Sequence, residues 1–344
     1  MIDVAVVIVS WNVRDYLVKC LRSVYAELER TGLSGAVFVV DNASTDGTAE
    51  LVQHLFPNVH LIQNEDNPGF AKANNQGMRA AAAYEPRYYF LLNPDTVVHP
   101  GALQALVACL EERPDAGMAG ARLMYGDGRF QHSAFYFPGL LQLAFDLFPM
   151  PARLYNSRWN GRYPKSLYHR DKEPFQIDHP LGATMLVRAD VAEATNGFDE
   201  SFRMYCEEID WSWRVQAAGW KIYAVPRAEI IHYGGESTRQ VPAQSVIDLW
   251  SSRARLYRQI HGRFRAGLAA RLVALGMKKK AARAKDPEMK RAYEEISRIW
   301  QSAGSTGETA GDVARAKDYR QQPDNPAAGS GRAGVIRGFF RKIY

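Results

Sequence analysis

Short apolar runs alternate with amphipathic segments along the first third of the chain. Each run is rich in β-branched residues and ends in polar residues, which is typical of a buried parallel strand. The segments between the runs carry apolar residues at helical spacing, so each is expected to form a helix that returns across the sheet. This alternation predicts a mostly parallel, doubly wound α/β sheet with helices on both faces. The expected strands are 4–9, 37–40, 59–62 and 88–92.

Capping residues and helix breakers mark the limits of the expected helices. Ser44 or Thr45 is expected to begin the second helix, Pro57 to end it, and Pro100 to begin the fourth. No Gly-x-Gly-x-x-Gly motif follows the first strand, which disfavours a dinucleotide-binding fold of the Rossmann type.

The regular pattern loosens after the fourth helix and then returns. Between residues 125 and 180, Tyr, Phe, Trp, Pro and Arg predominate, and long loops with one short helix are expected there. Further on, the pattern predicts a strand, a short helix, a longer helix ended by Gly219, and another strand. These later elements are expected at 184–188, 190–195, 207–218 and 220–225, and they complete an α/β domain over residues 1–240.

The C-terminal part differs from this domain in charge. Residues 253–291 contain thirteen Lys or Arg and only two acids, whereas the net charge of the whole chain is +6. We expect a basic helical extension over 241–300, with a solvated helix pair as the simplest interpretation. Residues 301–344 are expected to be a disordered linker and a basic, aromatic tail. Polybasic segments with Phe339 and Phe340 also favour contact with an anionic membrane surface.

Composition excludes several classes of protein. The 344 residues are 47% hydrophobic and 23% charged, which is ordinary for a globular protein. Cys20, Cys109 and Cys206 are far apart and form no Cys-x-x-Cys pair, which argues against a disulfide framework or zinc cluster and favours a reducing, cytoplasmic compartment. No signal peptide or bilayer-spanning stretch is expected. The basic excess could attract nucleic acid, but no recognition motif supports such a partner.

Carboxylates follow several of the predicted strands. In an open α/β sheet, ligands bind beyond the carboxyl ends of the strands, and Asp41, Asp95 and the pair Glu207-Glu208 lie at such ends. So many carboxylates suit an anionic ligand only if a divalent cation lies between them, as Mg²⁺ does when it shares substrate phosphates. We therefore expect Asp95 to hold a cation beside a diphosphate. The structural alternatives are an Asx turn for Asp41 and a helix N-terminal carboxylate for Asp95.

The motifs at these positions resemble a known family. They are Val-Ser-Trp-Asn at the end of the first strand, Val-Val-Asp-Asn-Ala-Ser-Thr-Asp-Gly-Thr at 39–48, Asn-Pro-Gly-Phe-Ala at 67–71 with Asn74-Asn75, Asn-Pro-Asp at 93–95, Gly-Phe-Asp-Glu at 197–200 and Glu-Glu-Ile-Asp at 207–210. Over roughly residues 1–240, the chain resembles a family 2 glycosyltransferase with the GT-A fold. Its Gly-Phe-Ala and Asn-Pro-Asp motifs most resemble the rhamnosyltransferase-like branch.

The resemblance implies a role for each matched residue on the donor side. Asp41 matches the residue that binds the nucleotide base, and Asp95 matches the last acid of an Asp-x-Asp metal motif, in which Asn93 replaces the first acid. His232 matches a histidine that binds the metal in some relatives, which suits Mn²⁺ better than Mg²⁺. A buried, hydrogen-bonded histidine is the alternative. The donor-binding residues implied in this way are Ser10, Asn12, Asp41, Asn67, Gly69, Asn74 and Asn93.

The resemblance also implies the catalytic residues. Inverting sugar transfer needs a base within hydrogen-bond reach of the acceptor hydroxyl. The family's acidic pair matches Glu207 and Glu208, and we expect Glu208 to be the base, with Glu207 as the second candidate. Asp210 completes the group and can pair with Arg214 one helical turn later. Adjacent carboxylates should raise at least one pKa, although an acidic helix N-terminus is the structural alternative.

Together these matches imply an inverting, metal-dependent glycosyltransferase of cell-envelope glycan synthesis. It would use Mg²⁺ or Mn²⁺ and transfer L-rhamnose from dTDP-rhamnose, as the favoured case, to a hydroxyl of a lipid-linked or polysaccharide acceptor. The alternatives are a UDP-hexose or UDP-galactofuranose donor, or a non-catalytic subunit that binds nucleotide sugars. We expect a cytoplasmic protein that contacts the inner face of the plasma membrane through its C-terminal segment.

Overall fold

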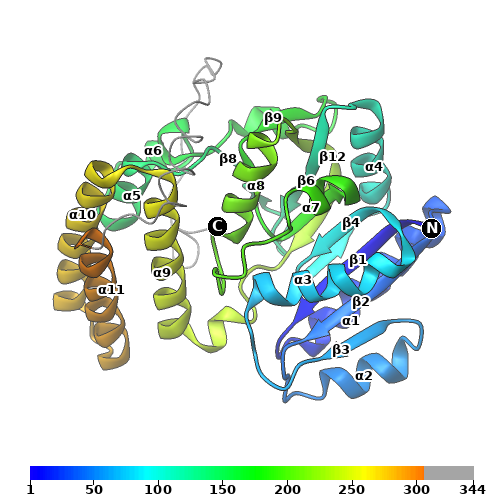
Figure 1. The fold of residues 1–344 in the computed structure, drawn as a ribbon, viewed down its shortest axis with the longest axis horizontal. Helices are drawn as coiled ribbons and strands as arrows, with labels where there is room; N and C mark the ends of the chain where they lie inside the picture. Colours follow the sequence, from blue (N-terminus) through cyan, green and yellow to red (C-terminus); the bar gives the residue numbers. More distant parts are fainter. Residues whose placement is uncertain (306–344) are drawn as a thin grey trace.

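The computed structural model describes residues 1–305, and one mixed sheet forms its centre (Figure 1). The strands follow the order β3-β2-β1-β4-β11-β6-β12-β5, and β7 and β9 pair with β6 and β12. All neighbours from β3 to β4 are parallel, as are β6 and β12, whereas β11 is antiparallel to both β4 and β6. The short strands β5, β7 and β9 are also antiparallel to their neighbours, but six of the ten strands run in the same direction, so the sheet is dominated by parallel strands, as predicted. Its strands are β1 (Ile2–Ser10), β2 (Gly35–Asp41), β3 (His60–Gln63), β4 (Pro86–Leu92), β5 (Thr96–Val98), β6 (Ala116–Met124), β7 (Phe130–Gln131), β9 (Phe175–Ile177), β11 (Thr184–Arg188) and β12 (Lys221–His232).

Helices cover both faces of this sheet because the side chains of a strand alternate between faces. On β1, Val4 and Val6 belong to a core shared with α1, α2 and α4, whereas Ala5 and Val7 belong to a core shared with α3, α7 and α8. The doubly wound arrangement is thus confirmed. These helices are α1 (Arg14–Thr31), α2 (Thr48–Leu55), α3 (Phe70–Ala81), α4 (Ala102–Glu112), α7 (Ala189–Ala194) and α8 (Glu207–Ala217).

The short strands β5, β7 and β9 were not predicted, and two longer strands also differ from the sequence expectations. Strand β6 was not predicted, because its Ala- and Gly-rich sequence has low β-propensity; small residues are required there, since a Cβ on Gly120 would lie 2.6 Å from Pro180. Strand β12 runs to His232 instead of ending at residue 225. Its pairing with β6 shifts register between Val225 and Glu229, around Pro226, which has no N–H group to donate.

Two helix starts were also predicted too early. Helix α2 begins at Thr48, because the Ser44 side chain bonds to Asp41 and residues 44–47 form a turn. Helix α4 begins at Ala102, two residues after Pro100. The loosely patterned region contains α5 (Leu140–Leu147), α6 (Ala152–Tyr155), short 3₁₀ turns and the two-stranded sheet of β8 (Ala134–Phe135) and β10 (His179–Pro180).

The C-terminal helices form a folded unit beside the sheet (Figure 1). Helices α9 (Pro242–Ile260), α10 (Arg263–Arg283) and α11 (Pro287–Ser305) share a hydrophobic core with α5. The Trp300 indole, buried in this core, donates a hydrogen bond of 2.9 Å to the Trp250 carbonyl. The interpretation as a solvated helix pair is therefore wrong, and we call α5, α9, α10 and α11 the helical unit. The predicted linker and tail lie outside the described residues, except that 301–305 continue α11.

Two general features bear on the class of protein. Within residues 1–305, no helix is long and apolar enough to cross a membrane. All three cysteines are buried and unpaired.

Candidate active site

A cavity of about 120 Å³, which we call the strand-end cavity, lies where the carboxyl ends of β1, β4 and β12 meet. Sheet register explains this meeting: Ser10 pairs with Asp41, Ile8 with Leu92, and His232 with Thr96. The structure thus brings together seven of the predicted site residues. Those that line the cavity are Ser10, Asn67, Asn93, Asp95, Glu207, Glu208 and His232.

Asp95 and His232 form a buried pair on one wall of this cavity. His232 Nε2 lies 3.4 Å from Asp95 Oδ1 and 3.4 Å from Asn93 Nδ2. On the other side of the ring, Nδ1 lies 3.2 Å from the Gln131 side-chain oxygen, and the Gly234 N–H donates to Asp95 Oδ2. Gln131 therefore orients the ring so that Nε2 faces the carboxylate, an orientation typical of a metal-binding histidine.

The donor set at this wall fits a divalent cation that is shared with a ligand. Burial by itself would raise the pKa of the Asp95 carboxyl, but the adjacent His232 ring and backbone N–H groups hold that pKa below its usual value, so Asp95 is ionised. No group of three or more His, Cys, Asp or Glu gathers as a metal site within residues 1–305. Asp95 and His232 would thus supply only part of a coordination shell, which diphosphate oxygens could complete.

Glu207 and Glu208 enter the cavity from the first turn of α8. Tyr205 and Cys206, directly before them, both have left-handed backbone angles, with φ of 69° and 67°. Such conformations are costly for residues other than glycine and are found most often at functional sites. Here they direct the N-terminus of α8, with both carboxyl groups, at the cavity.

The environment of the two glutamates changes their acidity in the predicted direction. Burial raises the pKa of Glu208 to about 7. Burial, together with the neighbouring Glu208 charge, raises the pKa of Glu207 well above its usual value. Glu207 Oε2 is buried without a protein partner, and so is the Ser10 hydroxyl. Polar atoms left unpaired on a cavity wall suit a polar ligand, because unpaired burial is costly.

A second cavity of about 130 Å³, the middle cavity, lies on the other side of Glu208. Leu181, Tyr205 and Glu208 line both cavities, whereas Glu207 lines only the strand-end cavity. Glu208 is therefore the carboxylate that can contact ligands in both spaces. Glu208 was the expected base, with Glu207 as the second candidate, and that choice stays a prediction.

Four of the predicted donor-binding residues do not line the strand-end cavity, and the first two of them are Asp41 and Asn12. Asp41 is 3% exposed, and its carboxylate accepts hydrogen bonds from the Ser44 N–H and hydroxyl. Asn12 accepts from the Thr45 N–H at 2.7 Å, and its own N–H donates to Ser44. Asn12 thus links the β1–α1 loop to the β2–α2 loop, and Asp41 fixes Ser44 within the second of these loops. A role for Asp41 in binding the nucleotide base stays a prediction.

Three further predicted residues have structural contacts outside the lining of the cavity. Asn74 donates to the Phe70 carbonyl within α3. Asp210 is 1% exposed, and its Oδ2 forms an ion pair with Arg214 Nε at 2.8 Å. This contact confirms the pairing predicted from their spacing. The third residue is Gly69, which lies where there is no space for a side chain.

Gly69 joins α3 to the segment before α8. Its φ of 95° lies in a region that glycine alone adopts readily, and a Cβ there would overlap the Arg203 carbonyl oxygen. That oxygen accepts a hydrogen bond from Phe70 N. Asn67, which lines the strand-end cavity, caps the same turn by accepting from Gly69 N at 3.1 Å.

The substitution Gly69→Ala is therefore expected to destabilise the protein by about 2 kcal/mol or more, through backbone strain plus overlap. Gly32→Ala is the matched control, because Gly32 also has a positive φ but has open space around its Cβ position. Urea unfolding of both variants measures the difference. Equal losses for the two variants would show that contact with Arg203 contributes nothing.

The loop after β12 contains cavity residues that the sequence analysis missed. Gly235, Glu236, Ser237 and Thr238 line the strand-end cavity, and the Ser237 hydroxyl donates to the Trp11 carbonyl. The available signal was a Gly-Gly pair followed by polar residues, two positions after a strand-end histidine. Trp11 and Asn42, each adjacent to a predicted residue, also line the cavity.

This fold is of the GT-A type. Comparison with protein families makes the assignment specific: the model described as glycosyl transferase family 2 matches residues 5–191, and the chain belongs to this family.

Similar proteins agree with this assignment. The chain is 31% identical over 246 residues to N-acetylglucosaminyl-diphospho-decaprenol L-rhamnosyltransferase of Mycobacterium tuberculosis, an alignment that covers 69% of this chain and 78% of that protein. It is 26% identical over 244 residues to Rhamnosyltransferase WbbL of Escherichia coli, covering 69% and 85%. The solved structure of GalNAc-T7 with UDP, GalNAc and Mn2+ superposes with a TM-score of 0.54 at 15% identity, over 95% of this chain and 59% of that one. This last likeness supports the fold.

Proposed function

We propose that the protein is an inverting, metal-dependent glycosyltransferase that uses a nucleotide-diphospho-sugar donor. One observation carries this proposal: Glu208, with a pKa of about 7, lines both the strand-end cavity and the middle cavity. A base in that position can reach an acceptor hydroxyl in one cavity while the donor sugar lies in the other. The family match supports the transfer of a sugar.

The reaction can be written from the residues at the site. The Glu208 carboxylate takes the proton from the acceptor hydroxyl as its oxygen bonds to the anomeric carbon of the donor sugar. The bond from that carbon to the diphosphate oxygen breaks, and the nucleoside diphosphate leaves from the opposite face, which inverts the configuration. Glu207 can accept a hydrogen bond from a sugar hydroxyl through its unpaired Oε2.

Asp95 and His232 are the residues that would hold a divalent cation, with Asn93 beside them. When bound, Mg²⁺ or Mn²⁺ neutralises charge on the leaving diphosphate. Gln131 and the Gly234 N–H orient the two ligands from behind. Ser10, Asn42 and Asn67 line the part of the cavity near β1 and β2, where we place the nucleotide, with Asp41 and Asn12 supporting the loops.

The favoured donor is dTDP-L-rhamnose, and the favoured acceptor is a sugar hydroxyl on a lipid-linked glycan. The support is similarity to two rhamnosyltransferases, one of which is named for a diphospho-decaprenol acceptor. A UDP-hexose or UDP-galactofuranose donor would use the same site. A non-catalytic subunit is a weaker second candidate, because it would have no need for a base between two cavities.

The experiment that tests this function is a thermal-shift screen of nucleotide sugars, with and without Mn²⁺, followed by transfer assays with the best donor. We expect one donor to raise the melting temperature by a few degrees only in the presence of Mn²⁺, since a ligand stabilises the state it binds. Inversion is checked by NMR of the product. Stabilisation by a donor without any transfer or hydrolysis would favour the non-catalytic subunit.

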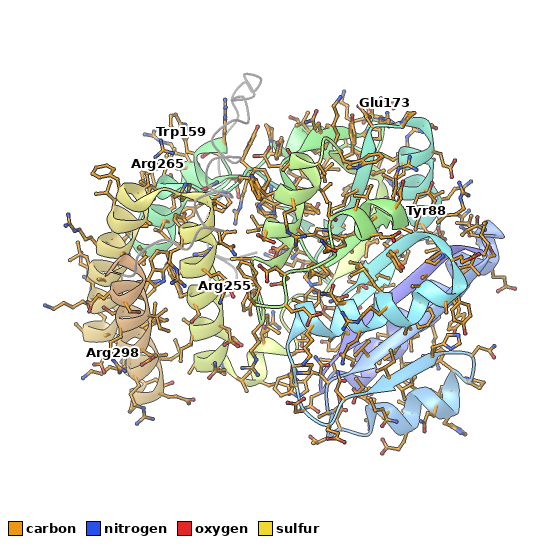
Figure 2. The ribbon with its side chains drawn as sticks, in the orientation of Figure 1. Tyr88, Trp159, Glu173, Arg255, Arg265 and Arg298 are labelled. Atoms are coloured by element: carbon orange, nitrogen blue, oxygen red, sulfur yellow. The ribbon has the colours of Figure 1, made fainter. Side chains whose placement is uncertain are left out.

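The helical unit also supports contact with an anionic membrane at the inner face of the plasma membrane. Phe264, Leu268 and Leu275 are exposed on one face of α10, with Arg271 at matching helical spacing between the two leucines. Trp159 is 64% exposed, and Figure 2 shows that it projects from the same end of the molecule as Arg265, which lies in the first turn of α10. Co-sedimentation with phosphatidylglycerol liposomes tests this contact, and equal binding by a Phe264→Ser, Leu275→Ser variant would exclude this face.

A further inference from the structure

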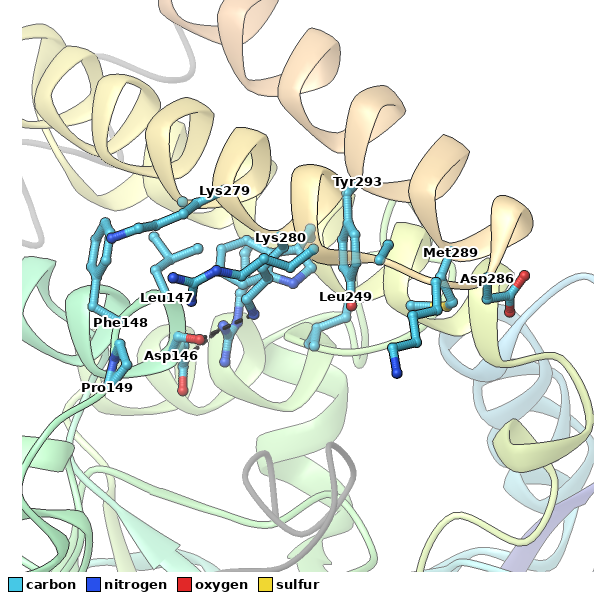
Figure 3. A pocket seen from close by; sticks show the side chains of 16 residues that line it. Asp146, Leu147, Phe148, Pro149, Leu249, Lys279, Lys280, Asp286, Met289 and Tyr293 are labelled. Carbon is cyan, nitrogen blue, oxygen red and sulfur yellow. Dashed lines mark hydrogen bonds and ion pairs between the residues drawn. The ribbon is translucent and has the colours of Figure 1, made fainter.

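The largest of the three cavities described lies inside the helical unit and is not explained by the family match, which ends at residue 191. This cavity, the helical-unit cavity, has a volume of about 560 Å³, within the roughly 300–1,000 Å³ typical of small-molecule sites. Figure 3 shows that Lys279 and Lys280 from α10 and Met289 and Tyr293 from α11 extend along the same space. The end of α5 closes it with Leu147 and Phe148.

One side of the helical-unit cavity is cationic. Five Lys or Arg line it, against two acids, Asp146 and Asp286. Asp146 is already paired with Arg253 at 2.6 Å, and its backbone carbonyl accepts from Lys280. Within residues 1–305, no acidic side chain pairs with the other three cations, which are Lys279, Arg283 and Lys285. Cations interact favourably with the C-terminal end of a helix, which explains the Lys and Arg residues in the last turn of α10. This interaction does not explain why apolar residues line the same cavity.

Apolar side chains line the same cavity beside these cations. Leu147, Phe148, Leu249, Met289 and Tyr293 face this cavity, and Lys279 lies over the Phe148 ring, 5.9 Å from its centre. A ligand that satisfies both sides must combine an anionic group with an adjacent apolar chain. A phosphate ester alone would leave the apolar walls in water, and a hydrocarbon alone would leave the cations unpaired.

The three cavities follow one another through shared residues. Asp146, Leu249 and Arg253 line both the helical-unit cavity and the middle cavity. The middle cavity in turn shares Glu208 with the strand-end cavity. A molecule that has a sugar at one end, an anionic group next and an apolar chain last would therefore place its sugar at Glu208 and its anionic group at Arg253 and α10.

We propose that the helical-unit cavity binds an amphiphile with a diphosphate joined to an isoprenoid chain, and that this amphiphile is the lipid part of the sugar acceptor. The assignment of the amphiphile as acceptor rests on the proposed function, whereas its binding does not. Lys279, Lys280 and Arg283 contact the diphosphate, and the apolar residues of α5, α9 and α11 contact the first isoprene units. The helical unit is thereby the acceptor-binding part of the enzyme.

Calorimetry on the full chain with farnesyl diphosphate, inorganic pyrophosphate and farnesol as separate probes tests this site. We expect farnesyl diphosphate to bind at least about tenfold more tightly than either fragment, because only the whole amphiphile uses both walls. The double variant Lys279→Gln, Arg283→Gln should weaken its binding by about tenfold or more. Lys278→Gln is the matched control, since Lys278 is on the same helix but does not line the cavity; its binding should stay within about twofold.

Several results would overturn the proposal. These are no binding of farnesyl diphosphate by the wild-type protein, equally tight binding of pyrophosphate alone or of farnesol alone, and equal weakening in the Lys278→Gln control. Unchanged binding in the double variant would also overturn it, provided that its melting temperature matches that of the wild type.

The failure of this site and the failure of the proposed function can be told apart. Donor-induced thermal stabilisation uses the strand-end cavity and should be unaffected in the double variant. If a donor stabilises the protein and sugar transfer occurs while farnesyl diphosphate does not bind, the site fails and the function stands. If farnesyl diphosphate binds as expected but no donor is bound or turned over, the function fails and the amphiphile site stands. With a sugar linked to a lipid diphosphate as acceptor, the double variant should raise KM and leave kcat nearly unchanged.

Discussion

Replacing Glu208 by glutamine is expected to lower kcat for sugar transfer by about 10²–10⁴-fold, the usual contribution of a general base. The change keeps the shape of the side chain and removes only its ability to take a proton. Donor binding should change little, because Asp95, His232 and the amide residues are untouched. Steady-state kinetics and donor thermal shifts measure the two effects separately. The variant Glu207→Gln provides the comparison. If it loses more kcat than Glu208→Gln does, the base is Glu207.

The pH dependence of the wild-type rate should report the same group. A general base acts in its deprotonated form, and burial raises the pKa of Glu208 to about 7. The rate should therefore rise with pH through about 7 and reach a plateau above it. In Glu208→Gln, this rise should disappear from the residual rate. A rate that already reaches its plateau near pH 5 in the wild type would contradict a raised pKa.

The contribution of Glu208 to the free energy of unfolding should fall as pH rises, whereas the rate increases. The folded-state pKa of Glu208 lies above that of an unfolded glutamate, so its contribution to stability is fully present below about pH 4.5 and is lost as pH rises through about 7. At pH 8, Glu208→Gln should therefore raise the free energy of unfolding by about 1–3 kcal/mol, and at pH 4 by much less. Glu294→Gln, an exposed glutamate of α11, is the control and should change neither value. A gain in stability with a loss of rate is characteristic of a functional carboxylate held in a costly environment.

The parts of the molecule that sequence patterns predicted well are those where one physical rule acts alone. Strands β1, β2 and β4 are continuous apolar runs between helices, and parallel order follows from that alternation. Strand β6 escaped prediction because close packing selects small residues there over β-branched ones: Gly117 lies against Trp220, and Gly120 lies against Pro180. The cost of a wider side chain at these positions exceeds any gain in β-propensity.

The candidate site shows a similar division. Strand ends can be predicted, so Asp95 was found from sequence, whereas His232 and the Glu207-Glu208 pair, which begins α8, were identified through the family resemblance; all four lie at one cavity. Which side chains face that cavity depends on loop geometry, and Asp41 turns to Ser44 whereas its neighbour Asn42 lines the wall. Contacts between distant segments, such as His232 with Gln131, leave no periodic signal in the sequence. The choice between the two glutamates likewise depends on cavities that are lined by many separate parts of the chain.

Asp95→Asn is expected to lower Mn²⁺ affinity and kcat/KM for the donor by about 100-fold or more, since changes behind a metal ligand alone typically cost about 10–100-fold. Asparagine fills the same space as aspartate, but its neutral amide is a much weaker ligand for a hard cation. Gln131→Leu should produce a smaller loss, because it removes only the partner that orients the His232 ring.

The substitution Asn93→Asp should have the opposite effect on Mn²⁺ affinity, because it places a second acid next to His232. It should tighten Mn²⁺ binding, because an added carboxylate strengthens a site for a hard cation that has only one. Calorimetric titration with Mn²⁺ alone, in the presence and absence of the nucleoside diphosphate, measures these affinities without relying on turnover. Because Asp95 and His232 would supply only part of the coordination shell among residues 1–305, the diphosphate should tighten Mn²⁺ binding in the wild type and do so far less in Asp95→Asn. Equal Mn²⁺ affinities in the wild type and Asp95→Asn, or full activity after treatment with a chelator, would remove the cation from this site and leave Asp95 as a structural partner of His232.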